Sequence, residues 1–145
     1  MVGYADYIIA SFDEVLREME REVFEVEAPF GGELFKKWLV QEGHSERTAT
    51  IYLSNIKRLD NDLFSIVMDE DFFRLLRDDL DTEPKKAHNL MENMLHAIDK
   101  ELESEDPFIP RKMLTNCRCA YVNYMKFIDV IINAIVNNAQ VADND

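Results

Sequence analysis

The sequence predicts an all-α protein, a compact bundle of about six helices, and three observations support this fold class. Apolar residues recur at intervals of three and four along most of the chain, which is the spacing of one face of an α-helix. The 145 residues include only four glycines and four prolines, and alternating β-branched runs are few. Because 47% of the residues are hydrophobic, a chain of this length can bury a core without disulfides or a structural metal.

Two helices are predicted in the first third of the chain. Residues 4–26 form the first one, since apolar residues such as Phe12 recur on one face and acidic residues fill the other. Pro29 and the glycines that follow it break the chain. A second helix is predicted over residues 33–42, and Gly43 caps its end.

The middle of the chain contains two more predicted helices and a connector. Ser45 is a good N-cap residue for a helix that continues to about Leu59. Residues 63–68 are expected to be an apolar connector. Asp69 can cap the next helix, whose apolar residues lie within 72–80.

The two longest predicted helices occupy the last part of the chain. Pro84 opens a helix over residues 85–103, and Pro110 precedes the last helix, which covers 111–138. The expected organisation has three parts: an acidic helix and linker at 1–32, a helical domain at 33–140, and a flexible tail at 141–145.

Charge is distributed unevenly along the chain. The 29 acidic residues exceed the 16 basic ones, and the resulting net charge of -13 argues against broad affinity for nucleic acids or anionic lipids. The segment 34–59 differs, because its five cations are accompanied only by Glu42 and Glu46. A basic segment in so acidic a chain indicates a local binding surface.

Cations and hydroxyl groups share one face of two predicted helices. Such faces suit phosphate contacts, because Arg and Lys neutralise charge while Ser and Thr donate hydrogen bonds. An ordinary solvated helix face is the alternative explanation for each stripe. The predicted nucleic-acid-binding residues are Lys36, Lys37, Arg47, Thr50, Ser54, Lys57 and Arg58 in the first region and Arg111, Thr115, Arg118 and Lys126 on the last helix.

Two sequence patterns suggest chemistry only weakly. His44 and Arg47 form an H-x-x-R tetrapeptide, but a capping role for Ser45 explains this stretch better. No set of nucleophile, base and orienting residue is visible, so neither an enzyme nor a catalytic residue is predicted.

A second pattern is the spacing of His88, Glu92 and His96 along one helix stripe. The two histidines are about two turns apart, too far to share a metal ion, so we expect a solvated polar stripe. No metal site and no cofactor is predicted.

The sequence also predicts a soluble, cytoplasmic protein without a membrane partner. Asp6 interrupts the apolar run at the amino terminus, which lacks the basic start of a signal peptide. Residues 127–136 form the longest apolar stretch and are fewer than the ~20 that span a bilayer. Cys117 and Cys119 are poorly spaced for a disulfide within a helix, so reduced thiols are expected, with Cys117 facing the core.

The segment 35–59 resembles the start of the SAM-like core-binding domain that lies upstream of the catalytic domain in tyrosine recombinases of the phage-integrase kind. The resemblance rests on an aromatic and a Leu on a short helix, a Gly-x-Ser turn, and a Thr and a Tyr at set distances: Phe35, Trp38, Leu39, Gly43, Ser45, Thr48 and Tyr52. The last helix is similar to that of the family at Thr115, Arg118, Ala120, Tyr124, Phe127 and Ile128.

This resemblance covers roughly residues 33–130 and implies a small helical bundle that clamps one side of a DNA duplex. The second and last helices of the bundle would face the DNA backbone. The catalytic half of the family is missing from this sequence, so the predicted function is non-catalytic binding of double-stranded DNA. Two alternatives remain: a protein–protein interaction module or homodimer that uses the C-terminal helix, and an acidic mimic of DNA.

Overall fold

The computed structural model describes residues 28–144, and the side chains within this part as far as residue 137. All the regular structure in this part is helical, as predicted. The elements are α3 (Gly32–Gln41), α4 (Glu46–Leu59), the π-helical turn η1 (Asp60–Phe64), α5 (Ser65–Val67), α6 (Phe72–Thr82), α7 (Pro84–Leu102) and α8 (Arg111–Asn144).

Five of the predicted helices lie in this part of the chain, and all five are present as α3, α4, α6, α7 and α8. The helix predicted over residues 4–26 lies outside the described residues, so the total of about six stays a prediction. Ser45 caps α4 as expected, because its hydroxyl accepts a hydrogen bond from the Thr48 N–H at 3.1 Å. Gly43 follows α3 with a φ of 104°, in the left-handed region that favours glycine.

The prediction that residues 63–68 form an apolar connector is wrong. The helical backbone of α4 continues through η1 and α5 as far as Val67. Leu63 and Phe64 are both buried, and the wider π turn allows both side chains to reach the core. A simple period of 3.6 residues does not reveal this change of helical pitch.

Two helix ends also differ from the prediction. Asp71 caps α6 in place of Asp69, since its carboxylate accepts a hydrogen bond from the Phe73 N–H at 3.1 Å. The last helix extends to Asn144, past the predicted end at residue 138 and through most of the segment expected as a tail.

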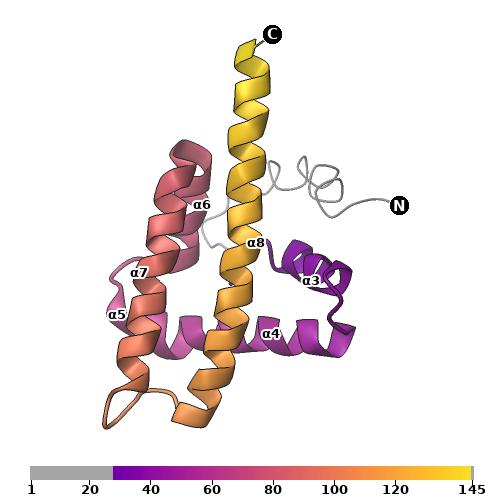
Figure 1. Cartoon of the computed structure of the whole chain (residues 1–145). Coiled ribbons are helices and arrows are strands. Elements are labelled where there is room, and N and C mark those ends of the chain that lie inside the picture. Colours follow the sequence, from indigo (N-terminus) through magenta and orange to yellow (C-terminus); the bar gives the residue numbers. More distant parts are fainter. Residues whose placement is uncertain (1–27, 145) are drawn as a thin grey trace.

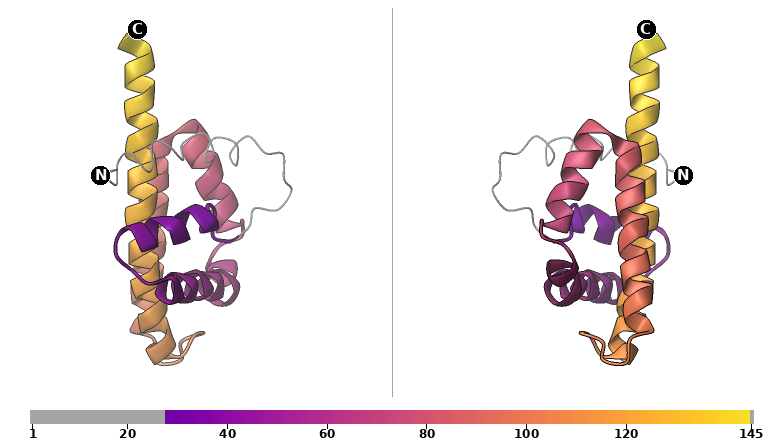
Figure 2. Two further views of the ribbon diagram at one scale, coloured as in Figure 1. Left: turned by 90° about the vertical axis from the view of Figure 1, so that its right-hand side faces the viewer. Right: turned by 90° about the vertical axis from the view of Figure 1, so that its left-hand side faces the viewer.

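Helix α8 is the axis of the structure (Figure 1). It contacts α3, α4 and α7, and α7 runs antiparallel beside it. The views in Figure 2 show that α4 crosses α8 at a steep angle and that the C-terminal end of α8 projects beyond the other described helices. By length and composition alone Arg111–Asn137 could cross a membrane, but its apolar side is packed in this core.

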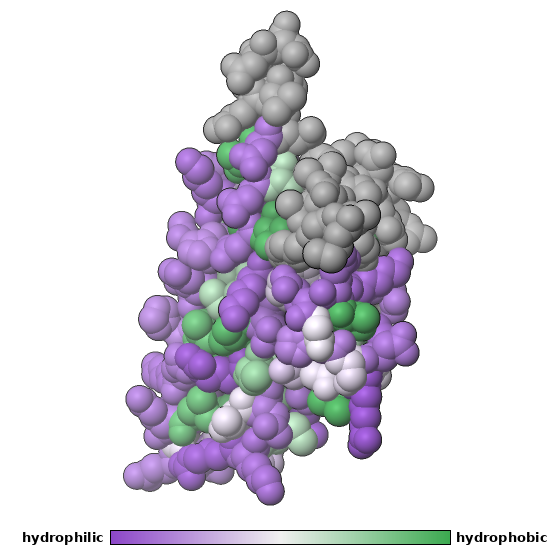
Figure 3. Space-filling model, turned by 45° about the vertical axis from the view of Figure 1, so that its right-hand side comes forward, coloured by the Kyte–Doolittle hydropathy of each residue, from purple (hydrophilic) through white to green (hydrophobic). Residues whose placement is uncertain are grey.

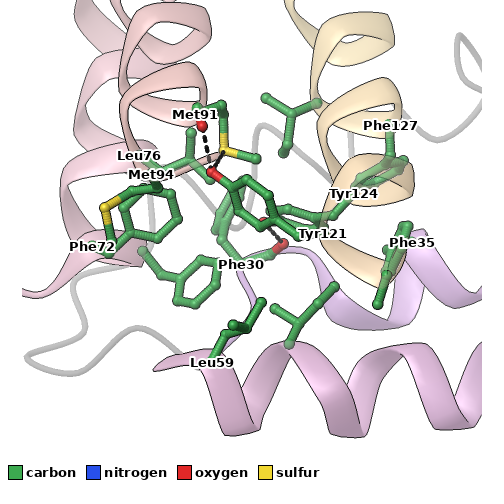
Figure 4. Packing of buried hydrophobic residues seen from close by; sticks show 14 of the residues in the cluster. Phe30, Phe35, Leu59, Phe72, Leu76, Met91, Met94, Tyr121, Tyr124 and Phe127 are labelled. Atoms are coloured by element: carbon green, nitrogen blue, oxygen red, sulfur yellow. Dashed lines mark hydrogen bonds between the residues drawn. The ribbon is translucent and has the colours of Figure 1, made fainter. Parts of the chain in front are cut away.

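Two tyrosines from neighbouring turns of α8 lie at the centre of the core (Figure 4). Tyr121 and Tyr124 are 0% exposed. The Tyr121 hydroxyl donates to the carbonyl oxygen of Met91 on α7 at 2.6 Å, and the Tyr124 hydroxyl donates to that of Phe30 at 2.6 Å. Since an unpaired buried hydroxyl costs about 1–3 kcal/mol, these bonds select one position for α7 and for the segment before α3.

Aromatic rings surround the two tyrosines. Phe35 meets Tyr124 edge to face with ring centroids 5.2 Å apart, and Phe64 meets Tyr121 in the same way at 5.7 Å. Among residues 28–137 no charged residue is buried. The charged side chains of this part of the chain are therefore at least partly exposed, although the Nη1 atom of Arg77 is buried.

Asp60, at the start of η1, is an exception to the ordinary behaviour of surface carboxylates. It lines a groove of ≈ 230 Å³ together with residues 69–71. Burial and, to a smaller extent, the nearby Asp71 carboxylate raise the pKa of Asp60 to about 6. Ionisation of Asp60 therefore costs more free energy in the folded protein than in the unfolded chain.

We predict that Asp60→Asn stabilises the fold at pH about 7.5. Because the pKa of Asp60 in the folded protein is above the ordinary value of 3.8, ionisation of Asp60 lowers the free energy of unfolding. This loss is complete at pH values above the folded pKa and absent below pH 3.8. After allowance for solvent screening of a half-buried group, the expected gain is about 1 kcal/mol and disappears as the pH falls to about 4. Urea unfolding at both pH values measures it, and a loss of stability at pH about 7.5 would contradict the prediction.

Candidate nucleic-acid interface

The outer face of α4 carries the first predicted binding stripe. Ala49, Ile56 and Leu59 are buried on the inner side of the helix, so residues on the opposite side must face solvent. We call this surface the α4 basic face; its members, all exposed, are Arg47, Thr50, Ser54, Lys57 and Arg58. At 100° per residue they fall within an arc of about 100°, and no acidic residue lies inside that arc.

Most of the α4 basic face is open to a ligand. Arg47 and Lys57 form no ion pair with any other residue in the described part of the chain. The Arg58 Nε lies 3.4 Å from the Asp62 Oδ2, but both side chains are more than 40% exposed, so this pair is weak and can be exchanged. The Thr50 hydroxyl donates to the Glu46 carbonyl oxygen at 2.9 Å.

Lys36 and Lys37 lie on the neighbouring helix α3. Lys37 is exposed and Lys36 is half-buried. A Cβ placed on Gly32 would contact the Leu53 side chain at 3.5 Å, so that side of α3 faces α4. Because Lys36 follows Gly32 by four residues, it lies on the side of α3 that faces α4.

The cations at the start of α8 have a different role. Arg118 Nε donates to the Asp99 Oδ1 on α7 at 2.5 Å, and this bond raises the pKa of the guanidinium. Arg111 Nε donates to the Leu102 carbonyl oxygen at 3.3 Å, and its Nη2 bonds the Ser104 carbonyl oxygen. These two arginines therefore tie α8 to the C-terminal end of α7.

Most of the α4 basic face points away from α8. The Tyr52 hydroxyl lies 3.5 Å from the Cys119 thiol, so this side of α4 is the one that meets α8. Tyr52 lies about 160° around the helix from Ser54, which is at the middle of the α4 basic face. Arg47 and Lys57 therefore face away from α8, whereas Arg58 lies near the start of α8, where its charge acts on the Cys117 thiol.

Thr115 and Lys126 remain exposed on the outer side of α8. The Thr115 hydroxyl donates to the Arg111 carbonyl oxygen at 2.9 Å. Lys126 lines a groove of ≈ 410 Å³ between α8 and the turn after α3, together with Glu42 and His44.

The patterns that suggested chemistry have structural roles. Ser45 caps α4, and the His44 ring packs against the Tyr52 ring with centroids 5.6 Å apart. Tyr121 and Tyr124 are fully buried, and burial raises the pKa of the Tyr121 hydroxyl well above its usual value. In the described part of the chain, no group of three or more His, Cys, Asp or Glu residues could hold a metal ion.

Sequence reasoning missed the partners of two residues. Asp99 pairs with Arg118, and Asp129 pairs with His88, although each pair joins two different helices. The residues of each pair are 19 and 41 positions apart, so no local spacing indicates them. Only the assumption that α7 and α8 pack antiparallel would have indicated these pairs from the sequence.

Comparisons with protein-family models, with curated proteins and with solved structures found no match to this chain.

We predict that Arg111→Ala lowers the free energy of unfolding by about 1 kcal/mol. The change removes two hydrogen bonds to carbonyl groups at the end of α7, where a cation also complements the helix dipole. Lys112→Ala is the matched control, because Lys112 is an exposed neighbour, and its effect should stay within about 0.5 kcal/mol. Equal effects in urea unfolding would show that the Arg111 bonds do not stabilise the fold.

Proposed function

We propose that this protein is a non-catalytic DNA-binding module whose α4 basic face contacts the phosphates on one side of a duplex. The observation that carries the proposal is the exposure of three cations and two hydroxyl-bearing residues on one acid-free face of a single helix. Surface arginines and lysines that need not hold the fold together are what a sequence-independent phosphate contact requires.

The dimensions of the α4 basic face suit a duplex. Arg47 and Arg58 are eleven residues apart, which corresponds to about 16 Å along the helix axis. The major groove of B-DNA is ~12 Å wide, so cations at the two ends of the face can meet phosphates on both of its edges. Lys36 and Lys37 on α3 would extend the same contact.

The charge of the whole chain limits the strength of this contact. With a net charge of -13, long-range repulsion opposes binding to a polyanion, so the expected affinity is low and strongly dependent on salt. The same acidic surface would orient the protein, because only the α4 side can approach the phosphates closely.

The integrase-like fold type is part of this proposal. A short helix, a tight Gly-His-Ser turn, a Ser-capped helix and a long final helix that crosses it occur in the expected order. In this form of the proposal α4 faces the DNA backbone, whereas the last helix supports α4 from the opposite side. Two of the predicted contacts on the last helix, Arg111 and Arg118, would then act in folding rather than in binding.

The test is fluorescence anisotropy with a labelled duplex of about 20 base pairs at low salt. We predict that Arg47→Ala with Lys57→Ala weakens binding at least tenfold and lowers the slope of log K against log salt by about 2, because each phosphate contact contributes about 0.9. The matched control is Lys86→Ala with Lys100→Ala on α7, which changes the net charge equally.

The control separates a local contact from a general effect of charge. If both double variants weaken binding equally, the α4 basic face is not the site. If the unmodified protein binds no duplex at low salt, DNA binding itself is refuted.

Exposed apolar residues near the end of α4 favour a second candidate, a protein-interaction module. Ile66 is 55% exposed and Val67 is 48% exposed, and both belong to α5. On the face shown in Figure 3 hydrophilic residues predominate and hydrophobic ones form small separate patches, so any such partner would be bound through a limited area. The apolar side of α8 is largely used in the core, which leaves only its distal turns for the predicted homodimer.

If the α5 residues form a self-association site, the unmodified protein should sediment as a dimer and Ile66→Ser with Val67→Ser should sediment as a monomer. Sedimentation velocity over a range of protein concentrations makes this comparison. A monomer at all concentrations before mutation would rule out self-association through α5.

A further inference from the structure

The contact between α7 and α8 contains two polar pairs along one edge. Arg118 of α8 pairs with Asp99 of α7, and Asp129 of α8 pairs with His88 of α7. The pairs are eleven residues apart on each helix, which is about three turns or 16 Å. They therefore lie on the same side of the interface, near its two ends, with the Tyr121 bond to Met91 between them.

The two pairs differ in how they respond to pH. A guanidinium remains charged at any physiological pH, and the bond to Asp99 raises the pKa of Arg118 further. An imidazole can lose its charge in this range. One end of the α7–α8 interface is therefore permanently paired, whereas the other end is titratable.

His88 uses both ring nitrogens. Its Nδ1 lies 2.9 Å from the Asp129 Oδ1, and its Nε2 lies 3.1 Å from the Glu92 Oε1. Both neighbours are carboxylates and can only accept when ionised, whereas a neutral imidazole has a single N–H. Both contacts are therefore hydrogen bonds at the same time only when the ring is doubly protonated and positively charged.

We propose that His88 is a pH-dependent clasp that holds the distal half of α8 against α7, while Arg118 and Asp99 keep the proximal half in place. When His88 loses a proton, one ring nitrogen presents a lone pair to a carboxylate, and the charge attraction across the two helices ends. The distal turns of α8, which carry Ile132 at 7% exposure and continue into the projecting end of the helix, are then free to separate from α7.

The surroundings of His88 support this assignment. The hydrogen bond to Asp129 raises the pKa of His88, partial desolvation opposes this, and the charges of Asp129 and Glu92 raise it again. Lys85 lines the same groove of ≈ 500 Å³ with Asn89 and is the cation that also faces this region.

The remaining helix that packs on α7 does not contribute a charged partner to the clasp. From α6, Asp79 interacts electrostatically with Lys86 and Glu83. The described residues that line the groove beside His88 come from α7 and α8 alone. The state of the clasp therefore depends on His88, its two carboxylates and Lys85.

The direction of the pH effect follows from linkage. The folded pKa of His88 lies above its ordinary value of 6.5, so the clasp stabilises the structure fully below about 6.5. This contribution is lost as the pH rises through the folded pKa. The distal part of α8 should therefore be best protected in mildly acidic solution.

NMR titration of the imidazole groups together with amide hydrogen exchange tests the clasp. We expect His88 to titrate above the ordinary imidazole pKa of 6.5, with both ring nitrogens protonated in mildly acidic solution. After correction for the intrinsic pH dependence of exchange, amides of residues 130–137 should lose protection at least roughly threefold as His88 deprotonates. Amides near Arg118 should not change.

Two variants make the test specific. His88→Arg keeps a positive charge at all pH values and should remove the pH dependence of protection in residues 130–137, whereas His88→Gln should leave these residues weakly protected throughout. His96→Gln is the matched control and should behave like the unmodified protein. A His88 titration at or below the ordinary imidazole pKa of 6.5, or unchanged pH dependence in His88→Arg, would overturn the proposal.

Discussion

Burial of one side of α8 is the constraint on which the rest of the structure depends. Tyr121 and Tyr124 occupy the centre of the core, and their hydroxyl groups must find acceptors because water cannot reach them. The acceptors are carbonyl groups of Met91 and Phe30, one on α7 and one before α3. A single pair of neighbouring turns on α8 thus sets the positions of segments that are far apart in the sequence.

The same constraint decides which charges can serve a ligand. Because α7 lies directly beside α8, the arginine and carboxylate side chains at the edges of their interface pair with each other, as Arg118 does with Asp99. Helix α4 crosses α8 and uses its Tyr52 side for that contact, so Arg47 and Lys57 point away from the bundle. The α4 basic face is therefore available to a ligand, whereas Arg111 and Arg118 in the similar stripe on α8 form hydrogen bonds within the fold.

The helical class and the start of α4 could be predicted because they depend on local interactions. Apolar spacing marks the inner side of each helix, and Ser45 bonds the Thr48 amide only three residues away. The π turn at Asp60 could not be predicted, because it arises where Leu63 and Phe64 must both enter a core formed by distant helices. The partners of Arg118 and His88 likewise depend on the register between α7 and α8.

The sequence by itself determined that this protein is helical, where most of its helices begin, and that cations gather on α4 within an acidic chain. The tertiary structure alone decided which charged residues remain free, since a side chain such as Arg118 or His88 is committed only when a second helix brings a carboxylate to it. Local spacing encodes the face of a helix on which a residue lies. Which other segment contacts that face is decided by packing between segments that are distant along the chain.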